Sequence, residues 1–212
     1  MSITMFLSHI DMSFQAILFD FDGVLCKDRF YETSLLPKYS AVYDWIQKNI
    51  FGNKELVRTW MRNQVGSSEI NNIIAKNTGM QYDVLNELFK ESIYTMVLDD
   101  TMLDLAGQLK LSGKKLGVVT DNMDIFTEIT VPHHRLNDVF DVVINSADYG
   151  MLKNENNGQL FDVALAALGQ KIEDSLVIDN SASPVDLFIK KGGHGFLYKD
   201  FAELKTFLQV NA

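Results

Sequence analysis

The sequence predicts an α/β fold, a doubly wound parallel sheet with helices on both faces and an all-helical segment inserted near its start. Short apolar runs of strand length end in polar residues. After residue 99 these runs alternate with helical stretches over short connections, the order typical of parallel sheets. Between residues 28 and 98 the apolar residues recur at helical spacing instead. We therefore expect a core of residues 1–27 and 99–212 and a helical insert of residues 28–98.

Composition restricts the possible classes of function. A chain of 212 residues, of which 47% are hydrophobic, can form one substantial core with an insert, and its apolar runs are too short to span a membrane. The formal net charge of −9, without a block of lysines or arginines, argues against nucleic acid and anionic membranes as partners. The single cysteine excludes an internal disulfide, and residues 1–13 have no signal-peptide pattern. We expect a cytoplasmic protein in which residues 1–13 are a frayed extension.

The first predicted strand is an apolar run that begins at Phe14 and stops at two aspartates, Asp20 and Asp22. Gly23 provides a turn directly after them. Ligands of open α/β sheets bind beyond the carboxyl ends of the strands, which is where these carboxylates are expected. A bend after Asp20 would let one carboxylate attack a substrate while the other transfers a proton. The alternative is an acidic turn that only caps the strand.

The insert is predicted to contain helices bounded by capping and breaking residues. They are expected over residues 37–52, 54–64, 67–79 and from 83 through 93. Most aromatic side chains of the insert are expected in its core, since packing is their usual role. Four residues are nevertheless candidates for substrate contacts: Phe30, Tyr31, Trp60 and Arg62.

The remainder of the chain is predicted to alternate between strands and helices. The expected elements are a helix over residues 100–111, a strand over 115–120, a strand over 140–144, a helix over 161–168, a strand over 175–180 and a final helix through 204 and 208, which residues 195–198 precede. Polar residues follow several of these strands: Asp20 the first, Thr120 the second, and Asp179 with Asn180 a later one. Lys153 lies in the loop after residue 144. Because the carboxyl ends of parallel strands share one edge, these side chains are expected to meet.

This arrangement resembles the haloacid dehalogenase-like superfamily of hydrolases, in the branch that has a helical cap. Four motifs occur in order within residues 14–209: Asp-Phe-Asp-Gly-Val at 20–24, the strand ending in Thr120, Gly-Met-Leu-Lys at 150–153 and Ile-Asp-Asn-Ser at 178–181. The insert between the first two motifs is at the position of the family's cap. Small sugar-phosphate phosphatases and beta-phosphoglucomutase-like proteins are the most similar members. The resemblance implies a Rossmann-like core.

The resemblance also implies roles for five residues. Asp20 would attack phosphorus and form an aspartyl-phosphate, because a carboxylate makes an acyl phosphate that water can reopen. Asp22 would protonate the leaving alcohol and then deprotonate that water. Thr120, Asp121 and Lys153 would bind the phosphate, with Lys153 also separating the crowded carboxylates.

A magnesium ion is implied as the cofactor. Its ligands would come from Asp20, Asp22, Asp179 and Asn180, and the ion would offset repulsion between the phosphate and the acidic nucleophile. The family usually has two adjacent acids in the fourth motif, whereas this chain has Asp179-Asn180. An asparagine carbonyl brings no charge, so we expect a weaker metal site or one that relies on Asp179.

The sequence therefore predicts a magnesium-dependent phosphatase that acts on a small phosphorylated metabolite, with a sugar phosphate as the best candidate. A phosphomutase would share every core residue and would return the phosphoryl group to its substrate. A phosphate-binding protein with little turnover is compatible with the altered fourth motif. A dehalogenase is disfavoured, because in that branch the position two residues after the nucleophile is not an acid, whereas this chain has Asp22.

Overall fold

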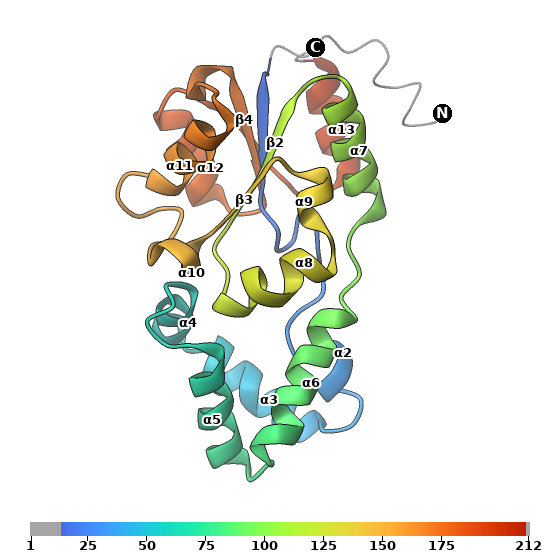
Figure 1. Cartoon of the computed structure of the whole chain (residues 1–212), viewed down its shortest axis with the longest axis vertical. Coiled ribbons are helices and arrows are strands. Elements are labelled where there is room, and N and C mark those ends of the chain that lie inside the picture. Colours follow the sequence, from blue (N-terminus) through green and yellow to red (C-terminus); the bar gives the residue numbers. More distant parts are fainter. Residues whose placement is uncertain (1–13, 211–212) are drawn as a thin grey trace.

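The computed structural model describes residues 14–210, so the expectation for residues 1–13 lies outside the described residues. Its centre is a five-stranded sheet with the strand order β3-β2-β1-β4-β5, and every neighbouring pair is parallel (Figure 1). The first strand lies in the middle and the chain builds outward from it in both directions. This confirms the predicted doubly wound α/β core. Within residues 14–210 we find no helix that is both long and apolar enough to cross a membrane.

The first four strands lie close to their predicted positions, and helices lie between the first two. The sequence pattern did not predict the helical elements within residues 126–139, 146–149, 172–174 and 182–190, nor the strand over 194–197. The core contains β1 (Ala16–Phe19), α7 (Asp100–Leu111), β2 (Lys115–Thr120), η2 (Phe126–Thr130), α8 (Val131–His133), α9 (Leu136–Val139), β3 (Val142–Asn145), α10 (Ser146–Tyr149), α11 (Gln159–Leu168), η3 (Ile172–Asp174), β4 (Ser175–Asp179), α12 (Ala182–Lys190), β5 (His194–Leu197) and α13 (Phe201–Val210). The insert contains α2 (Glu32–Leu35), α3 (Ser40–Ile46), η1 (Gln47–Phe51), α4 (Lys54–Met61), α5 (Ser67–Thr78) and α6 (Tyr82–Tyr94). The exact boundaries of the insert, 28 and 98, stay a prediction.

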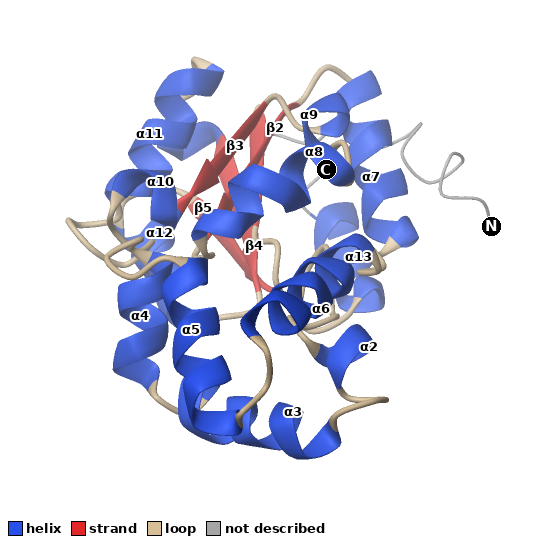
Figure 2. Ribbon diagram, turned by 60° about the horizontal axis from the view of Figure 1, so that its bottom comes forward, coloured by secondary structure: helices blue, strands red, loops and turns tan. Residues whose placement is uncertain are grey.

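Alternate residues of the central strand pack into opposite layers of the core. Ile17 and Phe19 pack in the layer that includes α7 and α13, whereas Ala16 and Leu18 pack in the layer that includes α11 and α12. Helices accordingly cover both faces of the sheet (Figure 2). A strand covered on both faces is apolar at every position, which explains why β1 is a continuous hydrophobic run in the sequence.

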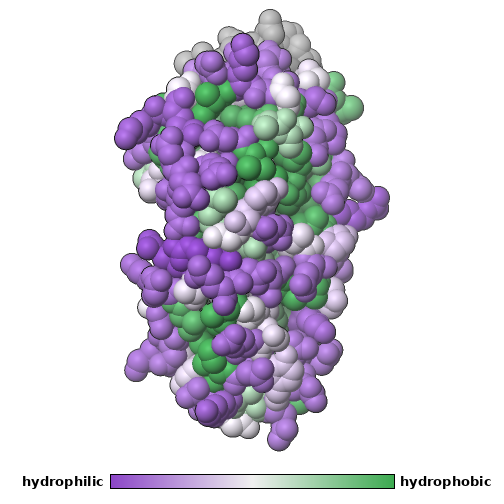
Figure 3. Space-filling model, turned by 60° about the vertical axis from the view of Figure 1, so that its left-hand side comes forward, coloured by the Kyte–Doolittle hydropathy of each residue, from purple (hydrophilic) through white to green (hydrophobic). Residues whose placement is uncertain are grey.

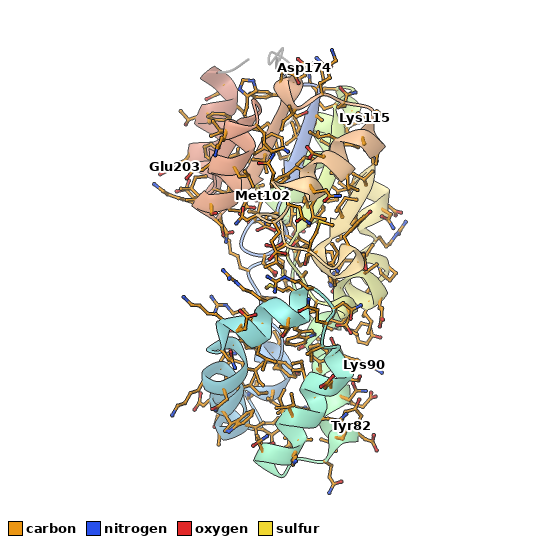
Figure 4. All side chains as sticks on the ribbon, turned by 90° about the vertical axis from the view of Figure 1, so that its left-hand side faces the viewer. Tyr82, Lys90, Met102, Lys115, Asp174 and Glu203 are labelled. Atoms are coloured by element: carbon orange, nitrogen blue, oxygen red, sulfur yellow. The ribbon has the colours of Figure 1, made fainter. Side chains whose placement is uncertain are left out.

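The strands all point their carboxyl ends toward the insert. Lys115, where β2 begins, and Asp174, directly before β4, both lie at the end of the molecule far from Tyr82 and Lys90 of α6 (Figure 4). The loops that follow the strands therefore lie between the sheet and the insert. Figure 3 shows hydrophilic side chains at mid-height of the molecule, between the sheet and the insert.

The insert has its own aromatic core. Tyr31 stacks on Phe89 with 4.7 Å between the ring centroids, and Phe30 packs against the same ring at 5.5 Å. Trp60 is fully buried and stacks on Phe51 at 6.2 Å. Since aromatic rings bury large areas, these contacts pack the short helices of the insert against one another, and the same cluster continues into the core.

The helix predicted to begin at residue 37 begins at Ser40 instead. The preceding residues close α2, which the sequence pattern did not predict because it spans a single turn; the amide of Tyr39 donates to the carbonyl of Leu35 over 2.7 Å. After Ile46 the helix widens into the π-helical turn η1, which ends before Gly52. A Cβ at this glycine would lie 2.3 Å from the carbonyl oxygen of Lys48, so only glycine fits there.

Side chains of the core hold the insert at several points. The carboxylate of Asp124, in the loop after β2, accepts hydrogen bonds from the amide of Ser67 (2.9 Å), from its hydroxyl and from Nε1 of Trp60 (3.2 Å). It thus places a negative charge at the N-terminus of α5, where the helix dipole favours it. The guanidinium of Arg62, directly after α4, donates to the carboxylate of Glu155 over 3.0 Å. Both contacts join segments far apart in the sequence.

Candidate active site

Asp20 directly follows β1 and is held by the strand ladder. Its amide donates to the carbonyl of Ile178 over 2.9 Å, and its own Oδ1 accepts from the amide of Phe21 over 2.8 Å. The chain then turns at Gly23, whose φ of +78° is in the left-handed region that favours glycine. The turn leaves the side chain of Asp22 exposed to a cavity, while only 6% of the Asp20 surface is exposed.

Lys153 brings two strands together through its charge. Its Nζ lies 2.9 Å from Oδ1 of Asp20 and 2.6 Å from Oδ2 of Asp179, and only 3% of the residue is exposed. Asp20 follows β1 and Asp179 ends β4, so one ammonium group links the carboxyl ends of neighbouring strands. Buried charges are tolerated when they are paired, and this ammonium has two anionic partners.

The protein environment shifts the acidity of these groups. Burial raises the pKa of Asp20 to about 6, although the Lys153 ammonium acts against it. Exclusion of water by the surrounding protein also raises the pKa of Asp22, and the negative charge of Asp20 adds to that effect. Burial alone would lower the pKa of Lys153, but the charges of Asp20 and Asp179 outweigh it and raise the pKa above its usual value. At neutral pH the site thus contains a fixed cation and a carboxyl that can hold a proton.

Asn122 is a site residue that the sequence analysis missed. Its Nδ2 donates to Oδ2 of Asp22 over 2.9 Å, and its Oδ1 accepts from the amide of Met123 over 2.9 Å. The amide of Asn122 in turn donates to the hydroxyl of Ser146 over 3.0 Å. The side chain is fully buried and so holds the Asp22 carboxylate in one orientation. The sequence signal that could have identified Asn122 is its position two residues after Thr120, where the predicted strand ends.

The predicted phosphate-binding residues Thr120 and Asp121 are in different surroundings. The hydroxyl of Thr120 is fully buried and has no hydrogen-bond partner within residues 14–210. A ligand oxygen could satisfy it, since buried hydroxyl groups are normally hydrogen-bonded. Asp121 uses Oδ1 to accept from the amide of Lys153 over 2.7 Å. In this structure Asp121 therefore positions the loop that carries the lysine.

The adjacent residues Asp179 and Asn180 also differ in their surroundings. Asp179 is fully buried; its Oδ2 accepts from Lys153, and its Oδ1 accepts from the amide of Ser181 over 2.8 Å. Asn180 is exposed and faces the same cavities as Asp22. Its amide packs against Gly23 so closely that a Cβ there would lie 2.0 Å from Nδ2. The contacts make Asp179 a partner of Lys153, and its role as a metal ligand stays a prediction.

The oxygen atoms near Asp22 suit a magnesium ion. Mg²⁺ prefers oxygen ligands, and protein sites typically supply one or two carboxylates while water and substrate phosphate complete the octahedron. The carboxylate of Asp20, the backbone carbonyl of Asp22 and the side-chain carbonyl of Asn180 fit that description, since Asp20, Asp22 and Asn180 line one cavity. Among the described residues no three His, Cys, Asp or Glu side chains form a metal cluster.

Two cavities meet at Asp22 beneath the insert. The first, which we call the catalytic cavity, has a volume of about 690 Å³ and contains Asp20, Lys153 and Asp121 on its core side. On its insert side it is lined by two cations one turn apart on α4, Lys54 and Arg58. The second, the side cavity, has a volume of about 500 Å³ and extends toward the loop of residues 26–30. The catalytic cavity can thus accept an anion between cationic groups of the core and the insert.

The structure separates the four candidate substrate contacts of the insert. Phe30 lines the side cavity. Tyr31 and Trp60 are fully buried, with the hydroxyl of Tyr31 donating to Oδ1 of Asn71 over 2.6 Å. The guanidinium of Arg62 is paired with Glu155. Tyr31, Trp60 and Arg62 therefore have structural partners already.

Comparison with known proteins identifies a family and a set of similar folds. The model of a family described as a haloacid dehalogenase-like hydrolase matches residues 14–183. No curated protein sequence matches the chain. The chain is similar to the HAD family enzyme BT-2542 of Bacteroides thetaiotaomicron, solved as a mutant with magnesium and inorganic phosphate. The two are 15% identical, with a TM-score of 0.69, and the match covers 90% of this chain and 98% of that one.

Two further solved structures are similar. One is a HAD-like family hydrolase of Porphyromonas gingivalis, with a TM-score of 0.70, 17% identity, and coverage of 93% of this chain and 98% of that chain. The other is an L-2-haloacid dehalogenase of Xanthobacter autotrophicus with chloropropionic acid covalently bound. It has a TM-score of 0.64, 14% identity, and coverage of 86% of this chain and 76% of that chain. At such identities the similarity establishes the fold alone.

Replacing Lys153 by methionine is expected to destabilise the protein in a pH-dependent way. Asp20 and Asp179 would lose their buried cation, and breaking such a pair typically costs about 3–5 kcal/mol. A carboxyl whose pKa is higher in the folded than in the unfolded protein lowers the free energy of unfolding. This loss is complete above the folded-state pKa and absent below the ordinary pKa of the carboxyl. The loss should therefore be large at pH 8 and smaller at pH 5, as measured by urea unfolding.

The matched control is Lys27→Met. The ammonium of Lys27 lies 3.7 Å from Asp99 and its side chain is 68% exposed, so its loss should change the free energy of unfolding by no more than about 0.5 kcal/mol. Equal losses for Lys153→Met at both pH values would contradict the proposed charge balance.

Proposed function

We propose that this chain, which belongs to the haloacid dehalogenase-like hydrolases, is a magnesium-dependent phosphatase that hydrolyses a small phosphate monoester through an aspartyl-phosphate. The observation that carries the proposal is the ion pair between Asp20 and Lys153, 2.9 Å apart at the end of β1 and beside a cavity of about 690 Å³. Asp22 lies two residues further on and faces the same cavity. A nucleophile, a fixed cation and a proton carrier thus share one site.

In the first step a carboxylate oxygen of Asp20 attacks phosphorus. A P–O bond forms to Asp20 while the P–O bond to the alcohol breaks. The departing alcohol oxygen takes a proton from Asp22, which the raised pKa of that carboxyl favours near neutral pH. Lys153 cannot leave its two carboxylate partners without exposing buried charge, so it offers a fixed positive charge to the phosphoryl oxygens.

In the second step water cleaves the aspartyl-phosphate. The water oxygen forms a bond to phosphorus, the P–O bond to Asp20 breaks, and Asp22, now a carboxylate, accepts the proton. Inorganic phosphate leaves and both aspartates return to their starting states. Asn122 keeps the Asp22 carboxylate oriented through both transfers by its 2.9 Å hydrogen bond.

Asp20, the backbone carbonyl of Asp22 and Asn180 would hold the magnesium ion, which leaves the Asp22 carboxyl free to carry a proton. When bound, the ion would neutralise negative charge on the phosphate and on the nucleophile. The solved structure of BT-2542 with magnesium and inorganic phosphate supports this assignment by similarity of fold. Asp179 would contribute by fixing Lys153 through their 2.6 Å contact.

The substrate is proposed to be a small phosphorylated metabolite, for which the sequence resemblance favours a sugar phosphate. The catalytic cavity, of about 690 Å³ and lined by core loops together with Lys54, Val57, Arg58 and Met61 of α4, supports a small substrate. A phosphomutase would transfer the same phosphoryl group to a second substrate hydroxyl instead of water. A phosphate-binding protein would show little turnover with any ester, so assays of phosphate release separate it from a phosphatase, whereas a phosphomutase is identified by the transfer of the phosphoryl group to a second hydroxyl.

Asp20→Asn is expected to lower kcat by at least about 10³-fold, because it removes the nucleophile and preserves the side-chain volume. The assay is phosphate release from 4-nitrophenyl phosphate with magnesium, together with a thermal unfolding curve. Asp104→Asn, an exposed substitution on α7, is the control and should retain wild-type activity. Retention of more than a tenth of the wild-type turnover by Asp20→Asn would refute the covalent mechanism.

Asp22→Asn should slow an alkyl phosphate by about 10²–10⁴-fold, since the alkoxide leaving group needs a proton. It should slow 4-nitrophenyl phosphate much less in the first step, because the nitrophenolate leaves without protonation. An asparagine oxygen at this position can still accept from Asn122, so the local geometry should be preserved. Single-turnover kinetics with both esters provide the measurement, and equal slowing of the two would show that Asp22 is not the general acid.

Asn180→Asp is expected to tighten magnesium binding by roughly tenfold, the lower end of the effects of altered metal-site contacts. The substitution adds a negative charge where Asn180 faces Asp22, and attraction for a divalent ion should rise accordingly. Calorimetric titration with magnesium alone measures the affinity, and the magnesium concentration for half-maximal activity provides a second value. An unchanged or weaker affinity would mean that Asn180 does not contact the metal.

A further inference from the structure

The side cavity differs in chemistry from the catalytic cavity beside it. Its walls are formed by six large apolar side chains from the insert, the connecting segments and the loop after β2: Phe30, Phe51, Val57, Met61, Met96 and Met123. Phe30, Met96 and Met123 are each less than a tenth exposed, so this wall is part of the packed structure. The cavity therefore presents a preformed apolar surface.

The two cavities share Asp22, so a single ligand can occupy both. Asp20 and Lys153 line only the catalytic cavity, and the phosphoryl group must reach Asp20. Asp22 would protonate the ester oxygen and lines both cavities. The alcohol part of the ester, attached to that oxygen, can thus extend from Asp22 into the side cavity. Phe51, Val57, Met61 and Asn180 also line both spaces and form the passage between them.

Two of the polar side chains that line the side cavity contact groups outside it. The Lys27 ammonium pairs with Asp99 at 3.7 Å, and Oδ2 of Asp28 accepts from the amide of Val97 over 2.8 Å. Arg29 also lines the cavity and is exposed. Gln47 lines the cavity, and its Nε2 is buried without a hydrogen-bond partner among the residues that the structure describes. Gln47 is accordingly the group suited to meet one polar substituent inside the cavity.

A sugar would be poorly matched to this cavity. Its several hydroxyl groups would enter a space whose inner wall is apolar, and each buried hydroxyl without a partner costs about 1–3 kcal/mol. An alkyl or aryl-alkyl alcohol would lose no hydrogen bonds there and would bury apolar area against Phe30 and Met96. The lining thus favours a hydrophobic leaving alcohol over a polyol.

We propose that the side cavity binds the alcohol part of the substrate and selects esters whose alcohol is predominantly apolar, with at most one polar substituent near Gln47. This inference rests on the proposed function, because it assumes that Asp20 accepts the phosphoryl group. It replaces the sugar phosphate favoured by sequence resemblance with a different substrate class.

The test compares two esters of primary alcohols, benzyl phosphate and glucose 6-phosphate, with magnesium present. Wild-type protein should show a kcat/KM for benzyl phosphate at least about tenfold higher, since even one methylene in an apolar pocket changes this ratio by about tenfold or more. Benzylphosphonate, which resists hydrolysis, should bind at least about tenfold more tightly than methylphosphonate in a calorimetric titration. The titration reports on the cavity independently of turnover.

Met96→Gln places an amide in the apolar wall at nearly constant volume and should reduce the preference for benzyl phosphate several-fold. Met80→Gln is the matched control, because Met80 is in the insert but lines a separate surface pocket beside Gly79. Val57→Thr is a second variant of almost equal shape at a half-buried site, and it keeps the test decisive if Met96→Gln fails to fold. Both cavity variants should weaken benzylphosphonate binding, whereas Met80→Gln should not.

Different results separate the two proposals. Hydrolysis of glucose 6-phosphate as efficient as that of benzyl phosphate, with equal binding of the two phosphonates, would overturn the substrate class and leave the phosphatase proposal intact. Absence of hydrolysis of every ester, including 4-nitrophenyl phosphate, would overturn the proposed function. In that case tight binding of benzylphosphonate that Met96→Gln or Val57→Thr weakens would still support an apolar-selective side cavity.

Discussion

The buried ammonium of Lys153 is the interaction on which the rest of the site depends. Asp20 and Asp179 end neighbouring strands and would repel one another in a medium of low dielectric constant, but the ammonium lies within 2.9 Å of one and 2.6 Å of the other. Asp121 holds the backbone of the same lysine and thereby ties the loop after β2 to the loop after β3. The ammonium and the backbone amide of one lysine thus connect four segments of the core.

Lys153 forms its ion pairs with Asp20 and Asp179 and not with Asp22, and that difference separates the chemistry of Asp22 from that of Asp20. The nearest fixed partner of Asp22 is neutral, the amide of Asn122, so its carboxyl can gain or lose a proton without breaking an ion pair. The turn at Gly23 makes the separation possible by directing two carboxylates of one short segment to different surroundings. Two adjacent carboxylates in different environments are a general way to divide nucleophilic and acid-base roles.

Local patterns in the sequence were sufficient to predict the first four strands of the sheet, because each of them is an apolar run that stops at a polar residue. They also predicted that Asp20, Asp22 and Lys153 would meet, since parallel strands share one carboxyl edge. Asn122 could not be assigned in this way, because its partner Asp22 is 100 residues away and any polar residue after Thr120 would give the same pattern. The single-turn α2, the π-helical turn η1 and the apolar wall of the side cavity likewise depend on contacts between distant segments, which periodicity does not report.

The carboxylate of Asp124 belongs to the core yet occupies the N-terminus of α5 in the insert, where Gly66 offers no side chain of its own. Glu155, two residues after Lys153, similarly holds Arg62. The insert is for this reason not an interchangeable module. A chimaera that combined this core with the helices of a relative would leave two acidic side chains without partners, and one of them lies in the loop that carries the catalytic cavity's lysine. Substrate range in such a lineage would then change more readily by side-chain replacement within the insert than by exchange of the insert as a whole.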